Sequence, residues 1–339
     1  MQILENHPLK TLNTFGIESF ARFFSELDSV DAMKEFLNHN ALKKMPKLIL
    51  GGGSNLLLTQ KHLDFAVLKN SIKGIEKTGE DKDFVYVRSG AGENWNELVQ
   101  YCIRNNYAGI ENLSLIPGNV GAGPMQNIGA YGVELKDVFH RLEALHISDL
   151  KTEIFNTQQC EFGYRESVFK RAAKGKYIIT TVTLRLNKKP VYSTSYGAIS
   201  KELENMGVKD LSISAISKAV CNIRSSKLPD PKIIGNAGSF FKNPEIDAAT
   251  FNSLKARFPD IIGYPLENGR VKLAAGWLIE QCGWKGKREG DAGVHALQAL
   301  VLVNYGQASG QQIYDLSSQV LESVFTKFGV MLEREVNII

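Results

Sequence analysis

Two glycine-rich segments are the parts of this sequence best suited to contact a phosphate-bearing ligand. The first follows the apolar residues 48–50 and reads Gly51-Gly52-Gly53-Ser54-Asn55. Backbone without side chains can approach a diphosphate closely and aim N–H groups at it, and the Ser54 and Asn55 side chains add donors. The segment therefore predicts an anion-binding turn; the alternative is a tight turn between two core strands.

The second glycine-rich segment covers residues 116–132 and reads IPGNVGAGPMQNIGAYG. Its prolines fix φ, its glycines leave room for a flat or extended ligand, and Gln126 and Asn127 can bond ring carbonyls or phosphates. A stretch of this length without periodicity is unusual inside a compact domain and tends to be functional. Two such loops around one ligand indicate a large cofactor with a diphosphate in its middle.

Several other kinds of site are excluded by spacing. The dinucleotide fingerprint GxGxxG and the P-loop GxxxxGK[ST] are both absent, so a Rossmann domain is not supported. The cysteines, which are Cys102, Cys160, Cys221 and Cys282, are far apart and form no CxxC pair. With only six histidines, they offer no metal site and no disulfide framework, so we expect buried thiols in a reducing compartment.

Composition places the chain among ordinary globular proteins. Its length of 339 residues suggests two or three domains. A content of 43% hydrophobic and 22% charged residues is typical of a chain with a buried core. The net charge of +4 is too mild to indicate a nucleic-acid-binding protein. The N-terminus lacks the layout of a signal peptide, and no apolar run approaches the ~18 residues of a membrane span. We therefore expect a cytoplasmic protein without a membrane span. We also expect it to be a monomer.

Hydrophobic patterns predict the elements that position these segments. Trp95, Leu98, Val99, Cys102 and Ile103 recur at helical spacing, so Trp95 and Cys102 are expected in the core. Strands are expected at 47–50, 65–69, 84–88 and 177–186, and further helices at 214–224, 248–258, 273–282 and 311–328. Gly329 suits a helix C-terminus, and residues 330–339 predict a strand that returns to an earlier sheet.

Five segments, taken together and in order, resemble one known family. They are GGGSNLL at 51–57, PGNVGAGPMQNIGAYG at 117–132, FGYRESVF at 162–169, GNAGSFFKNP at 235–244 and LEREV at 332–336. The sequence is similar to the UDP-N-acetylenolpyruvoylglucosamine reductases, also called UDP-N-acetylmuramate dehydrogenases, which are bacterial cell-wall enzymes. FGYRESVF followed by Ser195-Tyr196-Gly197 resembles the subclass with an extra tyrosine-bearing loop.

The resemblance implies an α+β fold in which non-covalent FAD is held by a two-part domain of the vanillyl-alcohol oxidase type. It places FAD-binding subdomains at 1–70, with 329–339 returning to it, and at 71–226, and a smaller α/β substrate-binding domain at 227–328. The implied FAD contacts are Gly51, Gly52, Gly53, Ser54, Asn55, Pro117, Gly118, Gly121, Gln126, Asn127, Gly129, Ala130 and Arg224. Asn119 and Gly123 depart from the family pattern, which commonly has serines in this loop.

The resemblance also implies the reaction, in which NADPH reduces the flavin and the flavin then reduces the enolpyruvyl ether of a UDP-sugar to a lactyl ether. This step belongs to peptidoglycan synthesis and so serves cell wall biogenesis, cell shape and cell division. With no second nucleotide fingerprint, we expect NADPH and the UDP-sugar to use the same flavin face in turn. The implied substrate contacts are Tyr164, Tyr196, Lys227, Asn243, Tyr264, Lys285 and Gln298.

The reaction requires a cation or donors at the substrate carboxylate and an acid for the neighbouring carbon. By resemblance, Arg165 binds the carboxylate, Glu335 lies beside the developing enolate and Ser239 donates the proton. Pattern alone does not separate Glu335 from Glu333, and no His-Asp set supports a serine hydrolase. The competing readings are another FAD-dependent oxidase or dehydrogenase of the same fold, and a nucleotide-sugar-binding module.

Overall fold

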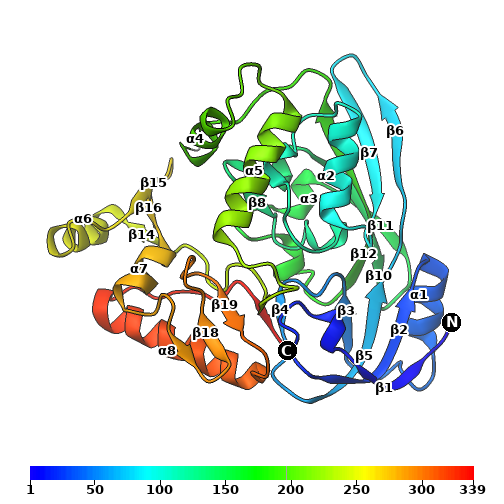
Figure 1. The fold of residues 1–339 in the computed structure, drawn as a ribbon. Helices are drawn as coiled ribbons and strands as arrows, with labels where there is room; N and C mark the ends of the chain where they lie inside the picture. The colour runs from blue at the N-terminus through cyan, green and yellow to red at the C-terminus, as the bar shows by residue number, and fades with distance from the viewer. Residues whose placement is uncertain (196) are drawn as a thin grey trace. The chain divides into compact units, whose positions relative to one another are not determined.

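The computed structural model describes residues 1–195 and 197–339, and the chain divides into two compact units (Figure 1). Unit 1 comprises Met1–His7, Ala21–Gly52 and His62–Ser226, and unit 2 comprises Pro8–Phe20, Gly53–Lys61 and Lys227–Ile339. Unit 2 therefore takes in two early segments that the family resemblance assigned to the FAD-binding subdomain at 1–70. The expected subdomain boundaries at residues 70 and 226 remain predictions.

A four-stranded sheet forms one part of unit 1, in the order β1-β2-β5-β3. Its strands are β1 (Leu4–Pro8), β2 (Phe20–Leu27), β5 (His62–Asn70) and β3 (Lys47–Leu50). Helix α1 (Val30–Asn38) buries Met33 and Phe36 in a core cluster with Leu68 of β5. The predicted strands at 47–50 and 65–69 are confirmed, and they pair in parallel as β3 and β5. The first glycine segment follows directly after the last residue of β3.

A five-stranded antiparallel sheet forms the second part of unit 1, in the order β11-β10-β12-β7-β6. Its strands are β11 (Thr152–Asn156), β10 (Phe139–His146), β12 (Tyr177–Asn187), β7 (Phe84–Gly90) and β6 (Ile75–Glu80). Helix α2 (Trp95–Arg104) begins after Asn94, whose side chain accepts from the Glu97 N–H. Trp95 and Cys102 are buried, as predicted from their spacing.

The rest of unit 1 consists of helices, two short strands and 3-10 turns. Helix α5 (Ile213–Lys227) packs Ile216 and Val220 against Ile199 of α4 (Gly197–Asn205), which confirms the helix expected at 214–224. The remaining elements of this unit are α3 (Thr157–Cys160), β8 (Gly129–Ala130), β9 (Val133–Glu134) and 3-10 turns at Glu111–Leu113, Val120–Ala122, Leu135–Asp137 and Val168–Lys170.

Unit 2 contains two small sheets, a parallel pair of two-residue strands, two longer helices and one short helix. One sheet has the order β13 (Gly235–Asn236), β19 (Leu302–Asn304), β18 (Ala292–Val294), β17 (Arg288–Glu289), and the other β14 (Glu245–Asp247), β16 (Arg270–Leu273), β15 (Gly263–Pro265). The helices are α6 (Ala248–Arg257), α7 (Ala275–Gln281) and α8 (Gly310–Phe328), and a 3-10 turn lies at Lys10–Leu12. Helix α8 ends at Gly329 with φ 68°, as predicted.

Two sequence predictions for unit 2 are wrong in part. Helix α7 begins at Ala275, because Leu273 still pairs with Gly263 in a sheet. Residues 330–339 do not form one strand, since only β20 (Asn337–Ile338) pairs regularly, in parallel with β4 (Leu56–Leu57). The backbone of this last segment bonds first to residues 240–242 and then to 55–59, and the change of partner interrupts the strand.

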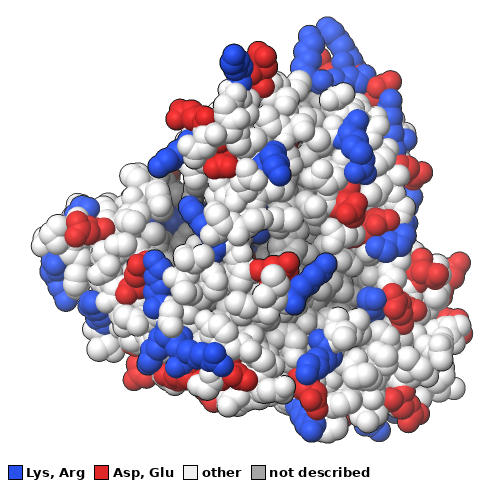
Figure 2. Space-filling view, viewed as in Figure 1, with Lys and Arg blue, Asp and Glu red and all other residues white. Residues whose placement is uncertain are grey.

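The thiols and the surface charge complete the description. All four cysteines are free; Cys102 and Cys160 are buried as predicted, whereas Cys221 and Cys282 are only half-buried. On the face drawn in Figure 2, basic and acidic side chains are interspersed, in keeping with the small net charge. In the described part of the chain, no helix is both long and apolar enough to cross a bilayer.

Candidate functional site

The structure brings the two glycine-rich segments into direct contact within unit 1. A Cβ added to Gly52 would lie 2.9 Å from Gly118 Cα and 2.9 Å from Asn119 Oδ1. This separation is well below ordinary van der Waals contact between carbon atoms. Glycine at 52 is therefore required for the two loops to lie this close together.

The second glycine segment is fixed to the turn between β7 and α2. Gly118 O accepts from Trp95 N at 3.0 Å, Gly121 N donates to Ala91 O at 2.9 Å, and Asn119 Nδ2 donates to Gly92 O at 3.1 Å. A Cβ on Gly121 would meet the Ala91 Cβ at 2.6 Å. Gly121 is thus a packing requirement of the loop, whether or not it also contacts a ligand.

Three backbone N–H groups of this region are not used by hydrogen bonds within the described part of the chain. Within residues 1–195 and 197–339, the backbone N–H groups of Gly52, Gly118 and Asn119 donate no hydrogen bond to the protein. None of these residues is buried, so an anion can reach the N–H groups. Neighbouring, unengaged N–H groups form an anion-binding nest, so these residues fit the expected FAD.

Sequence reasoning did not single out Gly90 and Gly92, which complete this part of unit 1. A Cβ on Gly90 would lie 2.4 Å from Ile72 O, and one on Gly92 would lie 2.6 Å from Ser71 Cα. Both glycines let residues 71–74 pack against residues 90–92, which in turn bond to the second glycine segment. Their position directly after a predicted strand was the signal available in the sequence.

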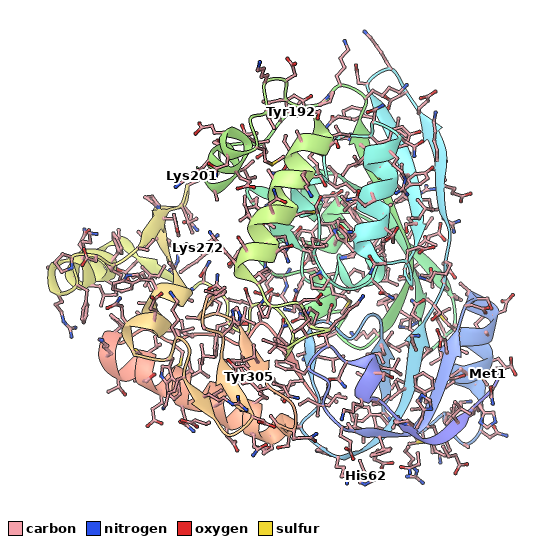
Figure 3. All side chains as sticks on the ribbon, in the orientation of Figure 1. Met1, His62, Tyr192, Lys201, Lys272 and Tyr305 are labelled. Atoms are coloured by element: carbon pink, nitrogen blue, oxygen red, sulfur yellow. The ribbon has the colours of Figure 1, made fainter. Side chains whose placement is uncertain are left out.

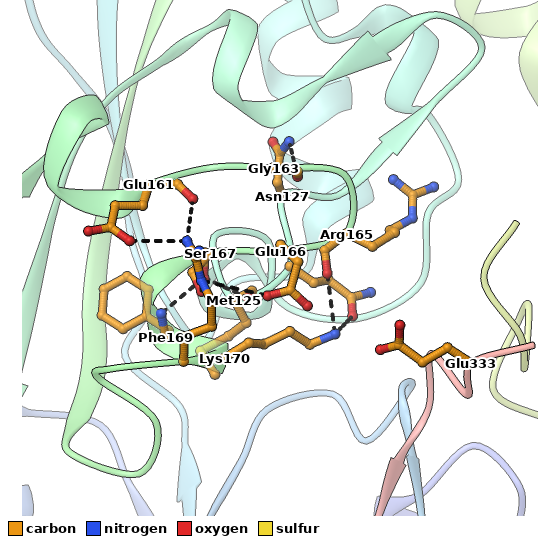
Figure 4. A network of polar contacts seen from close by, with 12 residues as sticks. Met125, Asn127, Glu161, Gly163, Arg165, Glu166, Ser167, Phe169, Lys170 and Glu333 are labelled. Carbon is orange, nitrogen blue, oxygen red and sulfur yellow. Dashed lines mark hydrogen bonds and ion pairs between the residues drawn. The ribbon is translucent and has the colours of Figure 1, made fainter. Parts of the chain in front are cut away.

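Arg165 lies in a tight turn of unit 1 that is attached to the second glycine segment (Figure 4). The turn is closed by hydrogen bonds between Gly163 and Glu166, and Arg165 adopts φ 54°. The guanidinium donates from Nη2 to Gly129 O at 2.7 Å and lies 5.4 Å from the Tyr164 ring centroid. The predicted residues Arg165, Tyr164 and Gly129 are therefore neighbours.

Arg224 lies on α5, also in unit 1. Its Nε donates to Leu115 O at 3.2 Å, and burial lowers the pKa of its guanidinium, an effect that the nearby Tyr131 partly offsets. Arg224 is therefore anchored to Leu115 and to Tyr131, near the two ends of the second glycine segment. The residue remains protonated at physiological pH, because an arginine pKa stays far above neutrality.

Ser239 and Glu335 are brought together within unit 2. The Glu335 N–H donates to Phe240 O at 2.8 Å, and Phe241 and Arg334 form an antiparallel bridge. Ser239 directly precedes Phe240, so the serine and the glutamate lie on adjacent backbone segments. Phe240 and Phe241 are fully buried and anchor the turn in the core, as predicted from the sequence.

The turn that presents Ser239 is open on one side. Gly238 adopts φ 70° and donates its N–H to Asn236 Oδ1 at 3.0 Å. A Cβ added to Gly238 would have no atom within 4 Å, so there is space beside the serine. A left-handed conformation favours glycine here, which explains the glycine before the serine.

The structure separates the two glutamates that the sequence pattern left equivalent. Glu333 is exposed and pairs with the Lys242 ammonium at 2.6 Å, whereas Glu335 is half-buried. Arg334, between them, donates to the hydroxyls of Ser317 and Ser318 of α8 at 2.8 and 2.7 Å. Glu335 therefore fits a role at a partly enclosed site better than Glu333 does.

The expected substrate contacts of unit 2 fall into two groups. Asn243 Oδ1 accepts from Ala275 N at 3.0 Å, and a Cβ on the neighbouring Gly276 would lie 3.2 Å from Gln298 Oε1, so both side chains reach the start of α7. Tyr264 is half exposed on β15, and its partner in the register with β16 is Lys272. Lys272 is labelled in Figure 3.

The remaining expected contacts are less constrained. Lys227 is exposed at the end of α5, and Lys285 pairs with Glu280 at 2.8 Å. Tyr196 lies outside the described residues. Among the described residues, no three His, Cys, Asp or Glu side chains gather so as to hold a metal ion.

Comparisons with known proteins define first the class and then the family. Residues 21–155 match the family model of an FAD binding domain, and residues 230–339 match that of the UDP-N-acetylenolpyruvoylglucosamine reductase C-terminal domain. A crystal structure of such a reductase from Thermus caldophilus aligns with a TM-score of 0.68 at 23% identity, over 99% of this chain and 98% of that one. The fold is thus the predicted FAD-binding type with a separate C-terminal domain.

Two curated relatives carry the family assignment. The UDP-N-acetylenolpyruvoylglucosamine reductase of Amoebophilus asiaticus is 54% identical, and that of Flavobacterium johnsoniae is 50% identical, each over 100% of both chains. The protein described here belongs to the UDP-N-acetylenolpyruvoylglucosamine reductase family. It is therefore an oxidoreductase of that family with an FAD-binding domain.

Proposed function

We propose that this chain is an NADPH-dependent flavoenzyme that reduces UDP-N-acetylglucosamine enolpyruvate to UDP-N-acetylmuramate in peptidoglycan precursor synthesis. Membership of the reductase family supports the reaction class. The observation that carries the proposal is the pairing of residues 240–242 with 333–335, because it sets Ser239 beside Glu335. A proton donor and an enolate-stabilising carboxyl are the two groups that the reaction needs near one carbon.

The cofactor-binding part of the proposal rests on unit 1. FAD, when bound, supplies the hydride that the enolpyruvyl double bond accepts. The N–H groups of Gly52, Gly118 and Asn119 bind its diphosphate, and Arg224 lies beside the same loop. Gly52 and Gly118 have no side chain, so the phosphates can approach their backbone donors closely.

Arg165 binds the substrate carboxylate in this mechanism. Its guanidinium stays charged at every relevant pH and offers a fork of donors that matches a carboxylate. Nη2 is held by Gly129 O at 2.7 Å, which fixes the direction of the fork. Negative charge that develops on the carboxylate during reduction is thereby stabilised by a group that is already oriented.

Ser239 donates a proton to the carbon next to the ether oxygen, and Glu335 stabilises the enolate by hydrogen bonding. A serine hydroxyl is a weak acid, but an enolate carbon is a strong enough base to take its proton. Solvent returns the proton before the next turnover. The UDP portion of the substrate is contacted by two lysines, two amide side chains and three tyrosines: Lys227, Lys285, Asn243, Gln298, Tyr164, Tyr196 and Tyr264.

NADPH and the UDP-sugar react in turn at the same flavin face. Steady-state kinetics should therefore give parallel double-reciprocal lines, and intersecting lines would argue for a ternary complex. We also infer a cytoplasmic monomer whose product supports cell shape and division.

The deciding experiment is NADPH oxidation by the purified protein with and without the enolpyruvyl UDP-sugar. Oxidation that depends on this sugar supports the proposal. A yellow protein that oxidises NADPH only with other sugars or hydroxy acids is a different flavoenzyme of this fold. A colourless protein that cannot be reconstituted with FAD is not a flavoenzyme.

A further inference from the structure

The turn that carries Arg165 has a backbone conformation that needs support. Arg165 adopts φ 54°, in the left-handed region that side-chain-bearing residues rarely occupy. Such residues persist when the surrounding structure determines them, and they cluster at functional sites. The contacts that hold the turn therefore decide where the guanidinium points.

Asn127 is the buried side chain that connects this turn to the rest of unit 1 (Figure 4). It is 0% exposed, and its Nδ2 donates to Gly163 O at 3.0 Å and to Glu134 Oε2 at 2.9 Å. Its Oδ1 accepts from Lys136 N at 3.0 Å. Both amide hydrogens are thus used by the protein, so the side chain has no donor to offer a ligand.

Two further contacts attach the same turn to the second glycine segment. Ser167 Oγ donates to Met125 O at 2.7 Å on one side, and Arg165 Nη2 donates to Gly129 O at 2.7 Å on the other. Lys170 Nζ adds bonds to Gln126 Oε1 at 3.3 Å and to Arg165 O at 3.4 Å. Among these groups, Asn127 holds the first residue of the turn.

We propose that Asn127 is a positioning residue for Arg165 and acts on substrate reduction through the Gly163–Glu166 turn, not as a contact of FAD. The proposal rests on the role of Arg165 given above. Without the amide, the Gly163 carbonyl keeps only the longer bond from the Glu166 N–H at 3.3 Å, and the turn relaxes. A displacement of about 1 Å at a catalytic group is enough to reduce the rate about 100-fold.

The test separates the two half-reactions of the FAD-loaded protein. Asn127→Gly tolerates the φ of 45° at this position but removes the amide, and Asn127→Asp keeps the shape while placing a carboxylate against Glu134. In both variants, flavin oxidation by the enolpyruvyl UDP-sugar should slow by roughly 10- to 100-fold at saturating sugar. Flavin reduction by NADPH and the Kd for FAD should stay within about twofold of the wild-type values.

Asn105→Ala is the matched control, because Asn105 lies in the same unit and also bonds a backbone carbonyl, Tyr101 O at 2.8 Å. It should leave both half-reactions unchanged. An unchanged second half-reaction in the Asn127 variants, or folded variants that lose FAD, would overturn the proposal. If neither variant folds, Ser167→Ala must show the same selective loss, and wild-type rates there would also overturn it.

The outcomes distinguish this proposal from the proposed function. If the wild-type flavin is not oxidised by the enolpyruvyl UDP-sugar, the proposed function fails. If the wild type is active and the Asn127 variants match it, the proposed function stands and the positioning role of Asn127 fails.

Discussion

Substitution of Gly52 by alanine tests whether the contact between the two glycine segments creates the cofactor site. The new Cβ would lie 2.9 Å from Gly118 Cα, and ordinary carbon–carbon contact begins at about 3.5 Å. The loops must therefore separate by about 0.6 Å, the difference between these two distances. Rotation of a side chain cannot relieve this clash, because the opposing atom belongs to the backbone.

Overpacking of this size costs about 1–3 kcal/mol in well-packed regions. If the substitution destabilises the FAD-bound state by this free energy relative to the FAD-free state, the Kd for FAD should rise about 5- to 150-fold. Asn119 cannot move freely either, since its Nδ2 is bonded to Gly92 O. The assay is titration of the FAD-free protein with FAD, followed by the change in flavin fluorescence.

Gly79→Ala is the control for this prediction. Gly79 lies in β6 of the same unit, and a Cβ there would meet no atom within 4 Å. The control should bind FAD as the wild type does. If Gly52→Ala binds FAD as tightly as Gly79→Ala does, binding of the FAD diphosphate does not depend on this contact. The assignment of the anion-binding nest at Gly52, Gly118 and Asn119 is then wrong.

Three further predictions address unit 2 and the core of unit 1. Ser239→Ala should abolish turnover of the enolpyruvyl sugar while flavin reduction by NADPH stays nearly intact, and stopped-flow spectroscopy would show both; loss of the two together contradicts a proton-donor role. Arg334→Lys loses the fork that bonds two hydroxyls of α8, so thermal unfolding should show a loss of about 1–2 kcal/mol and oxidation of the flavin by substrate should slow. An unchanged melting temperature would exclude this anchoring role. Burial raises the pKa of Glu111, so the native state binds this proton more tightly than the unfolded chain does. Stability therefore falls as pH rises from the ordinary carboxyl pKa through the raised native pKa. In urea unfolding, the free energy of unfolding of Glu111→Gln minus that of the wild type should therefore increase from acidic to neutral pH. A difference that does not change with pH would contradict this cause.

Local sequence patterns predicted the elements that depend on local interactions. The spacing of Trp95, Leu98 and Cys102 gave α2, and Gly329 marked the end of α8, because helical periodicity and a C-terminal glycine act within a few residues. Strands 47–50 and 177–186 were equally visible from their apolar runs. The five motif segments also named the residues that the structure gathers around Arg165 and beside Ser239.

Predictions failed where the answer depends on a distant partner. The segment 330–339 is extended, yet it changes partner between residues 242 and 55, and no local pattern records such a change. The left-handed turn at Arg165 is likewise fixed by Asn127, 36 residues before Gly163. The close contacts of Gly90 and Gly92 with residues 71–72 became apparent only when the loops were seen packed together.

The route of the chain through unit 2 has a consequence for its synthesis. Ile339 exchanges hydrogen bonds with Leu57 and Thr59, and the Thr59 hydroxyl also donates to the Ile339 carbonyl at 2.7 Å. Domains tend to fold in N-to-C order as the ribosome extends the chain, and closing so long a loop is slow. The pairing of residues 55–59 with 337–339 must therefore wait for almost the whole protein to emerge, and the backbone pairing beside Ser239 is completed only after Glu335 leaves the exit tunnel. A nascent chain stalled before residue 333 would contain all of unit 1 but would lack both of these backbone pairings of unit 2.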